Sequence, residues 1–386
     1  MANQDLRKPL GQRTIVRVAI VAVIALLVLC RGFAEQAKSP DLVVTNLHIP
    51  TGESGKKGLA AVMIRPNDSL PHPLALVTHG TPQDYSQLSP FAYFFEAQEF
   101  ARRGWTTVIV LRRGFGDSGG DYAENPGPCG PMTDYEGVTR QAAIDLRAAA
   151  IYLDSRPEVD ASRMIAIGHS TGGLAVVGLT ANPPPNLVAA ISFAGGRGHG
   201  SSPPGQVCAP ETLISAFASF GKRARVPMLW VYATNDQNFG PDLAEQLYGA
   251  YTRGGGKVTF IRAAPFAQDG HRLFSEAGIP IWTAMVDDFL KRQNLALRDT
   301  LLDIPPPAVA PPDFLPQAFR KDFQLYLYSP AHKAFAASKN GHIGYVSGRP
   351  SVDDARKHAL EACKKSAPKY DPCTIAMVDD QKISTN

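Results

Sequence analysis

Two serines in this 386-residue chain lie between glycines, in a spacing that is typical of a reactive hydroxyl group. Ser170 belongs to Gly168-His-Ser-Thr-Gly172, and Ser118 belongs to Gly116-Asp-Ser-Gly-Gly120. Flanking glycines let a serine occupy a tight, strained turn, because they leave room where a Cβ atom would clash. Such a hydroxyl can attack a carbonyl carbon if a neighbouring base removes its proton.

The surrounding segments favour Ser170 over Ser118 as the nucleophile. The apolar run 164–167 predicts a buried strand and the run 174–179 a buried helix, so Ser170 lies at a strand-to-helix turn. Ser118 is followed by a proline- and glycine-rich segment, 121–131, in which no helix can begin. Its motif also occurs in chymotrypsin-like proteases, but these carry their histidine and aspartate before the serine in an all-β fold.

A serine nucleophile needs a base, and His271 is the best placed of the nine histidines. It lies beside a glycine, after a predicted strand at 257–261 and before a predicted closing helix at 280–291. A solvated loop histidine is the other interpretation of this position. Asp236 directly follows the predicted strand 227–233, and we expect its carboxylate to orient the imidazole ring of His271.

Two other aspartates are weaker candidates for the acid. Asp242 stands at the start of a predicted helix, where a carboxylate is favoured by the helix dipole alone. Asp269 is too close to His271 in the sequence to be its default partner.

Stabilising an oxyanion requires two backbone N–H groups. We expect one from Thr171, directly after the nucleophile, and one from Thr81, in the loop after an early strand. His79 is expected to hold that loop rather than to act as a second base. The segment 112–119 follows the next strand and is expected to form the pocket wall. The residues expected to shape the site are His79, Gly80, Arg113, Gly168 and Gly172.

Apolar runs alternate with helical segments, which predicts an α/β domain over residues 40–295 with a mostly parallel sheet and helices on both faces. The expected strands are 42–48, 59–64, 74–78, 106–111, 164–167, 188–193, 227–233 and 257–261. The expected helices are 90–103, one opened by a capping box at 133–136, the helix after Ser170, 212–220, 241–253 and 280–291.

A proline-rich stretch at 301–316 predicts a semi-rigid linker, and residues 320–386 predict a small α+β module. Its expected strands are 323–328, 342–346 and 374–378, with a helix that Ser351 caps and that runs to Lys365.

The first 34 residues predict a signal peptide or anchor. Basic residues precede a 12-residue apolar stretch, 18–29, and Gly32-Phe-Ala34 resembles a cleavage site, so the mature chain would begin near Glu35. An uncleaved anchor and lipid attachment at Cys30 are the alternatives. We expect a periplasmic or secreted protein.

Export permits disulfides among the four cysteines that remain beyond Cys30. Cys363 and Cys373 lie close together in the C-terminal module and are expected to pair. Cys129 and Cys208 lie in proline- and glycine-rich loops and are also expected to pair. Two free thiols are the alternative for the second pair.

Together these segments resemble the α/β-hydrolase superfamily, and within it the exported enzymes similar to dienelactone hydrolases and prolyl oligopeptidases. The resemblance covers about residues 40–292 and implies a fold and a Ser-His-Asp triad that uses no metal and no cofactor. Dienelactone hydrolases proper use cysteine where this chain has Ser170, so their lactonase activity is not carried over. The residues that carry the resemblance are His79-Gly80, the segment 113–118, Gly168, Ser170, Gly172, Asn235-Asp236 and Asp269-Gly-His271.

The sequence therefore predicts a serine hydrolase that cleaves carboxylic ester bonds in a small molecule. An exported aminopeptidase or amidase on short peptides, an acyltransferase and a non-catalytic binding protein are the alternatives. The formal net charge of +4 gives no case for nucleic-acid binding. Contact with a membrane is expected only through an uncleaved N-terminal segment.

Overall fold

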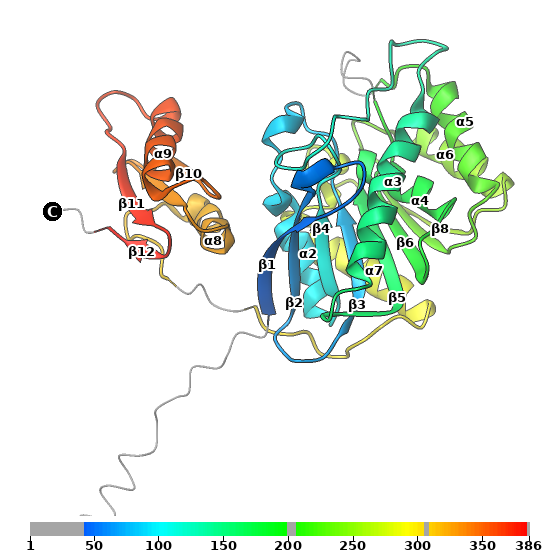
Figure 1. The fold of residues 1–386 in the computed structure, drawn as a ribbon. Helices are drawn as coiled ribbons and strands as arrows, with labels where there is room; N and C mark the ends of the chain where they lie inside the picture. The colour runs from blue at the N-terminus through cyan, green and yellow to red at the C-terminus, as the bar shows by residue number, and fades with distance from the viewer. Residues whose placement is uncertain (1–41, 199–205, 305–308, 384–386) are drawn as a thin grey trace, which may run out of the picture. The chain divides into compact units, whose positions relative to one another are not determined.

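The computed structural model describes residues 42–198, 206–304 and 309–383. An eight-stranded sheet with the order β1-β2-β4-β3-β5-β6-β7-β8 carries the candidate site (Figure 1). The first two pairings, β1 with β2 and β2 with β4, are antiparallel, and the remaining ones are parallel. The expected mostly parallel sheet is confirmed. Its strands are β1 (Leu42–Ile49), β2 (Leu59–Pro66), β3 (His72–Thr78), β4 (Thr106–Val110), β5 (Val159–His169), β6 (Leu187–Phe193), β7 (Met228–Ala233) and β8 (Val258–Ala263).

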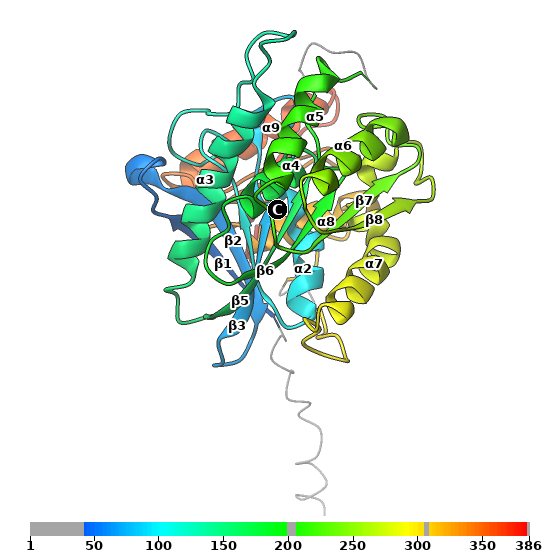
Figure 2. The ribbon, with the colours of Figure 1, turned by 90° about the vertical axis from the view of Figure 1, so that its right-hand side faces the viewer.

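Helices cover both faces of this sheet (Figure 2). One face packs against α3 (Tyr135–Leu153), α4 (Thr171–Thr180), α5 (Pro210–Gly221) and α6 (Pro241–Arg253), and the other against α2 (Phe94–Arg102) and α7 (Ile279–Arg292). Strand β3 shows the pattern: Leu74 and Leu76 join the first core, whereas Ala75 and Val77 join the second. Continuous apolar runs such as this one are what a strand buried on both sides requires.

The parallel strands end at a common edge, which brings their following loops together. Thr78 at the end of β3 pairs with Gly168 of β5, and Ala233 at the end of β7 pairs with Ala263 of β8. Short 3-10 helices lie in the connections at Gly55–Lys57 (η1), Tyr85–Gln87 (η2), Pro90–Tyr93 (η3), Gly270–Leu273 (η4), Glu276–Gly278 (η5) and Gln317–Phe319 (η6).

Helix α3 begins one step later than the sequence suggested. The expected capping box used Thr133 and Glu136, but the side chain of Asp134 accepts the hydrogen bond from the N–H of Gly137 at 2.7 Å. The Thr133 hydroxyl instead accepts from Gly130 N–H and donates to a carbonyl of the same loop. The prediction was wrong because a carboxylate one residue later was free to cap, whereas the threonine orders the loop before the helix.

The C-terminal residues form an antiparallel sheet with the order β10-β9-β11-β12. Its strands are β9 (Ala334–Ala337), β10 (Ile343–Val346), β11 (Thr374–Val378) and β12 (Gln381–Lys382), and its helices are α8 (Arg320–Tyr328) and α9 (Val352–Ser366). Ser351 caps α9 as expected, by accepting from the N–H of Asp354. The predicted strand 323–328 is wrong, because this segment is helical and buries Phe323 and Tyr326, three residues apart, on one side.

Several expectations fall partly or wholly outside the described residues. These are the signal segment 1–34 and residues 305–308 of the linker. Within the described ranges, no helix is long and apolar enough to cross a membrane. The domain boundaries drawn from the sequence stay predictions.

Candidate active site

Ser170 occupies the sharp turn between β5 and α4. Its backbone angles are φ +57° and ψ −123°, a strained conformation for a residue with a side chain. A Cβ on Gly168 would lie 2.1 Å from the carbonyl oxygen of Gly172, and one on Gly172 would lie 2.4 Å from that of His79. Both glycines are therefore required for the chain to turn here and to present the serine.

The Ser170 side chain opens onto a pocket of about 350 Å³. His271, Thr81, Tyr93, His169 and Glu96 also line it. No hydrogen bond joins the Ser170 hydroxyl to the His271 ring in this structure, although both side chains line the same pocket. In the described part of the chain, no group of three or more His, Cys, Asp or Glu side chains is arranged to hold a metal ion.

The structure brings Asp236 and His271 together from the loops after β7 and β8. The carboxylate oxygens of Asp236 lie 3.2 and 3.1 Å from Nδ1 of His271, and the carboxylate is fully buried. Its Oδ1 also accepts from the backbone N–H groups of Asn238 at 2.7 Å and Phe239 at 2.9 Å. An aspartate fixed in this way can hold the imidazole with its Nε2 directed away from the carboxylate.

Asp269, the weaker candidate for the acid, instead ties the two loops together. Its Oδ1 accepts from the backbone N–H of His271 at 2.9 Å and of Gln237 at 3.0 Å. Asn235 adds a second connection, since its Oδ1 accepts from Phe266 N–H at 2.9 Å. The positions of the acid and the base are thus coupled through backbone contacts as well as directly.

The two segments expected to supply oxyanion donors meet beside the nucleophile. The hydroxyls of Thr81 and Thr171 are hydrogen-bonded at 2.9 Å. Thr171 is the first residue of α4, so its N–H has no acceptor within the helix. A Cβ added to Gly80 would lie 3.0 Å from the Cβ of Ser170, which explains the glycine at this close approach.

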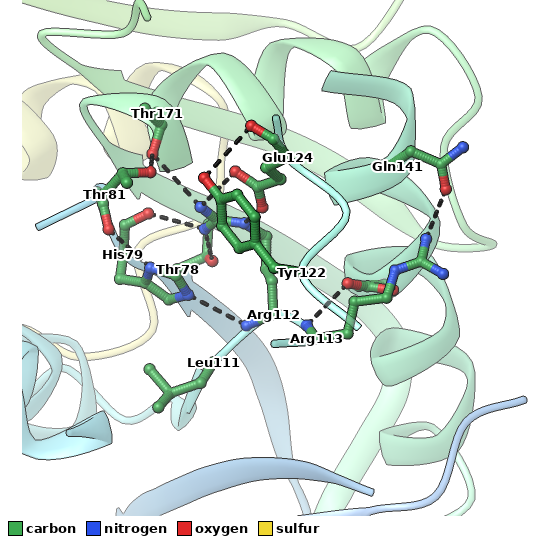
Figure 3. Close-up of polar contacts among 12 residues, drawn as sticks. Thr78, His79, Thr81, Leu111, Arg112, Arg113, Tyr122, Glu124, Gln141 and Thr171 are labelled. Atoms are coloured by element: carbon green, nitrogen blue, oxygen red, sulfur yellow. Dashed lines mark hydrogen bonds and ion pairs between the residues drawn. The ribbon is translucent and has the colours of Figure 1, made fainter. Parts of the chain in front are cut away.

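Arg112, at the end of β4, lies beneath the loop that carries Thr81 (Figure 3). Its Nη1 donates to the hydroxyl of Thr78 and to the carbonyl of His79, both at 2.8 Å, and its Nη2 donates to the Thr171 hydroxyl at 3.4 Å. The buried His79 ring accepts from Arg112 N–H at 3.1 Å and donates to the carbonyl of Gly80 at 2.8 Å. His79 therefore connects the end of β4 to this loop.

Glu124 balances the buried charge of Arg112. Its carboxylate pairs with Arg112 and, at 2.9 Å, with Nη1 of Arg197. Burial by itself would raise the pKa of Glu124, but the two guanidinium groups outweigh it and lower the pKa to about 2. Burial, reinforced by the charge of Arg112, lowers the pKa of His79 well below its usual value, so this ring is neutral.

Arg113, which the sequence placed in the pocket wall, is not among the residues that line the pocket. Its side chain points away from Arg112, toward Gln141 (Figure 3), and it pairs with Asp145 at 3.2 Å.

Ser118, the rejected nucleophile, is buried, and its hydroxyl is already hydrogen-bonded. It donates to the carbonyl of Leu111 at 2.8 Å and accepts from the N–H of Ala60 at 2.9 Å. These contacts stabilise the loop that contains Ser118, and Ser118 does not line the pocket.

Sequence reasoning missed two side chains that organise the site, namely Tyr93 and His169. Tyr93 donates to Nδ1 of His169 at 2.9 Å and accepts from the N–H of Gly80 at 3.1 Å. His169 stands directly before Ser170, at a position the motif leaves open, so only its place at the strand end could have pointed to it. Tyr93 lies in η3 and carries no local signal.

Both cysteine pairs are bonded in the structure. Cys129 and Cys208 have Cα atoms 5.7 Å apart, and Cys363 and Cys373 have Cα atoms 6.1 Å apart. The first bridge joins the loop before α3 to the residues before α5. Disulfides of this kind fit an oxidising environment.

Comparison with known proteins gives a match of part of the chain to one family model and several similar folds. Residues 55–215 match the model of a family described as X-Pro dipeptidyl-peptidase (S15 family), while no curated protein sequence matches the chain. The solved structures that it is similar to include a putative dienelactone hydrolase from Klebsiella pneumoniae, at 16% identity, covering 64% of this chain and 97% of that one, with a TM-score of 0.43. Thermogutta terrifontis esterase 2 phosphonylated by sarin is 15% identical, with coverage of 66% and 97% and a TM-score of 0.48. An acetyl xylan esterase from Paenibacillus sp. R4 is 17% identical, with coverage of 74% and 96% and a TM-score of 0.46.

Proposed function

We propose that this chain, a hydrolase of the α/β-hydrolase superfamily and of the serine esterase or peptidase type, cleaves carboxylic esters through an acyl-enzyme on Ser170. The proposal rests on the observation that three side chains from separate loops come together. Ser170 in its strained turn and His271 line one pocket, and the buried Asp236 carboxylate is bonded to the far side of the His271 ring.

The reaction begins with attack of the Ser170 hydroxyl on the ester carbonyl. His271 Nε2 removes the hydroxyl proton and then delivers it to the departing alcohol, while Asp236 holds Nδ1–H and stabilises the imidazolium that forms. The N–H groups of Thr81 and Thr171 receive the oxyanion. Water, activated by the same imidazole, then releases the acid and restores the serine.

Labelling with a fluorophosphonate probe tests the nucleophile, with hydrolysis of p-nitrophenyl acetate as the parallel readout. We expect the wild-type chain to be labelled and active, and Ser170→Ala to lose both properties. Ser118→Ala is the matched control, because Ser118 has the same flanking glycines but is buried away from the pocket. Labelling that survives Ser170→Ala, or that disappears in Ser118→Ala while that variant stays folded, contradicts the proposal.

A peptidase is the second candidate, and the similarity to the S15 family favours it. The same nucleophile, base and acid would then cleave an amide. Comparing kcat/KM on p-nitrophenyl esters with that on dipeptidyl anilides containing proline at the second position separates the two. Preference for the anilide would assign the peptidase, and transfer of the acyl group to an added alcohol instead of water would assign an acyltransferase.

We also propose that the chain is exported, which the two disulfides support. Removal of residues 1–34 by signal peptidase would leave an N-terminus near Glu35. N-terminal sequencing of protein recovered from outside the cytoplasm tests this, and an intact Met1 would favour an anchored form.

A further inference from the structure

We propose that Tyr93 and His169 are positioning residues that hold the loop of the base and the loop of the oxyanion donors in a fixed relation around Ser170. This inference rests on the proposed function, because it assigns roles relative to the nucleophile and base named there. Tyr93 comes from η3 and His169 from the end of β5. We call the hydrogen bonds that run from Gly80 through Tyr93 and His169 to His271 the Tyr93–His169 bridge.

The hydrogen bonds of the bridge can run in only one direction. The carbonyl oxygen of His271 can only accept, so Nε2 of His169, 2.8 Å away, carries the proton. Nδ1 of His169 is then an acceptor, and the Tyr93 hydroxyl at 2.9 Å donates to it. The Tyr93 oxygen in turn accepts from the N–H of Gly80 at 3.1 Å. One tautomer and one hydroxyl orientation satisfy all three contacts.

Both side chains keep these protonation states around neutral pH. Burial, reinforced by the charge that His271 carries when protonated, lowers the pKa of His169 to about 3, and burial raises the pKa of Tyr93 to about 12. The ring centres of His169 and His271 are only 4.9 Å apart. A neutral His169 does not repel the imidazolium that forms on His271 during the reaction, so the bridge can hold the base without opposing its protonation.

On the side of the base, the bridge completes the fixation of the backbone. The N–H of His271 donates to Asp269 at 2.9 Å, and its carbonyl accepts from His169. Both peptide groups that flank the Cα of His271 are therefore held, one by its own loop and the other by the turn that presents the nucleophile. Movement of the base away from Ser170 requires one of these bonds to break.

On the side of the oxyanion donors, the bridge occupies one backbone N–H group and leaves the next one free to bind the oxyanion. The N–H of Gly80 is engaged by Tyr93, so it is not the free donor of this loop. The next amide, that of Thr81, remains for the oxyanion. Since small misplacements of catalytic groups cost up to about 100-fold in rate, a bond that fixes Gly80 acts directly on the geometry of this donor.

Two substitutions of His169 test the two ends of the bridge separately. His169→Gln places a donor where Nε2 was and keeps the bond to the His271 carbonyl. His169→Asn places an acceptor where Nδ1 was and keeps the bond from Tyr93, but leaves the His271 carbonyl unpaired. Tyr93→Phe removes the hydroxyl and frees both Gly80 and His169. The measurements are kcat and KM on p-nitrophenyl acetate, the rate of fluorophosphonate labelling, and the Tm of each variant.

We expect His169→Asn and Tyr93→Phe to lose about 10- to 100-fold in kcat with KM within about twofold. His169→Gln keeps the bond to the His271 carbonyl but loses the bond from Tyr93, so we expect its kcat to fall less than in either of these variants. A purely structural role would lower Tm in all three variants and leave kcat unchanged, which overturns the proposal. Nitrogen NMR shifts of His169 give an independent readout, since the bridge requires the Nε2–H tautomer, and the Nδ1–H tautomer would overturn it. Failure of the wild type to label at Ser170 overturns the proposed function itself, which the Ser170→Ala comparison detects separately.

Discussion

The hydroxyl groups of Thr81 and Thr171 are hydrogen-bonded at 2.9 Å, although the residues are 90 positions apart in the sequence. The Thr171 hydroxyl also accepts from Nη2 of Arg112 at 3.4 Å. This contact joins the two backbone segments from which the oxyanion donors are expected. The spacing of the two donors is therefore set by side chains as well as by the sheet.

Thr171→Val keeps the shape of the side chain and removes this hydroxyl. We expect kcat on p-nitrophenyl acetate to fall about tenfold with KM little changed, because loosening an oxyanion donor weakens binding of the transition state more than binding of the substrate. Thr180→Val, at the other end of the same helix, removes a buried hydroxyl far from the pocket and is the control. Equal kcat values for the two variants would contradict the role of the Thr81–Thr171 contact.

Arg112→Met tests the buried charge network under the loop that carries Thr81. The substitution leaves the Glu124 carboxylate buried with only Arg197 as its partner, and we expect a loss of about 3–5 kcal/mol in the free energy of unfolding. Urea denaturation measures it. Arg292→Met breaks an exposed pair with Asp288 and should cost less than about 1 kcal/mol. Similar losses in both variants would mean that the buried network does not stabilise the fold.

Asp236→Asn keeps the size of the acid and removes its charge. The amide cannot stabilise the imidazolium on His271, so we expect kcat to fall by about 10³- to 10⁴-fold while the protein stays folded. Asp269→Asn is the matched control, since Asp269 contacts the backbone of the same loop but not the imidazole ring. A larger loss of kcat in Asp269→Asn than in Asp236→Asn would contradict the assignment of Asp236 as the acid.

The raised pKa of buried Glu96 predicts that the stability of the protein depends on pH. Burial, reinforced by the charge of Glu276, raises the pKa of Glu96 from 4.5 to about 7. Between these values the folded chain holds a proton that the unfolded chain has released, so the contribution of Glu96 to stability falls as pH rises. The full change amounts to about 3 kcal/mol across this window.

Glu96→Gln should remove this part of the pH dependence. Asp145, whose pKa is raised to about 6 by burial, contributes in the same direction in both proteins and cancels in the comparison. Urea denaturation at several pH values between 4.5 and 7 measures the difference between wild type and variant. Parallel stability curves would show that Glu96 is ionised at its ordinary pKa.

Most of the catalytic fold could be predicted from the sequence because its signals are local. The apolar runs of β3 and β7 are long enough to indicate strands. The glycines at 168 and 172 indicate the tight turn around Ser170, where a Cβ atom would clash. The order of Ser170, Asp236 and His271 along the chain, each after a strand, predicted that parallel strand ends would gather them. The segment 323–328 failed for the converse reason, since an alternating apolar pattern of six residues fits a strand and a short helix equally well.

The sequence by itself determined the turn at Ser170 and the types of residue that follow the strands, because backbone strain, glycine and apolar periodicity act over a few neighbouring positions. Only the tertiary structure decided that Arg112 rather than Arg113 lies beneath the loop that carries Thr81, and that Tyr93 and His169 link Gly80 to His271. These choices depend on the side to which a strand-end residue turns and on contacts between residues 76 and 102 positions apart. Distances and directions across the sheet set such contacts, and no pattern along the chain records them.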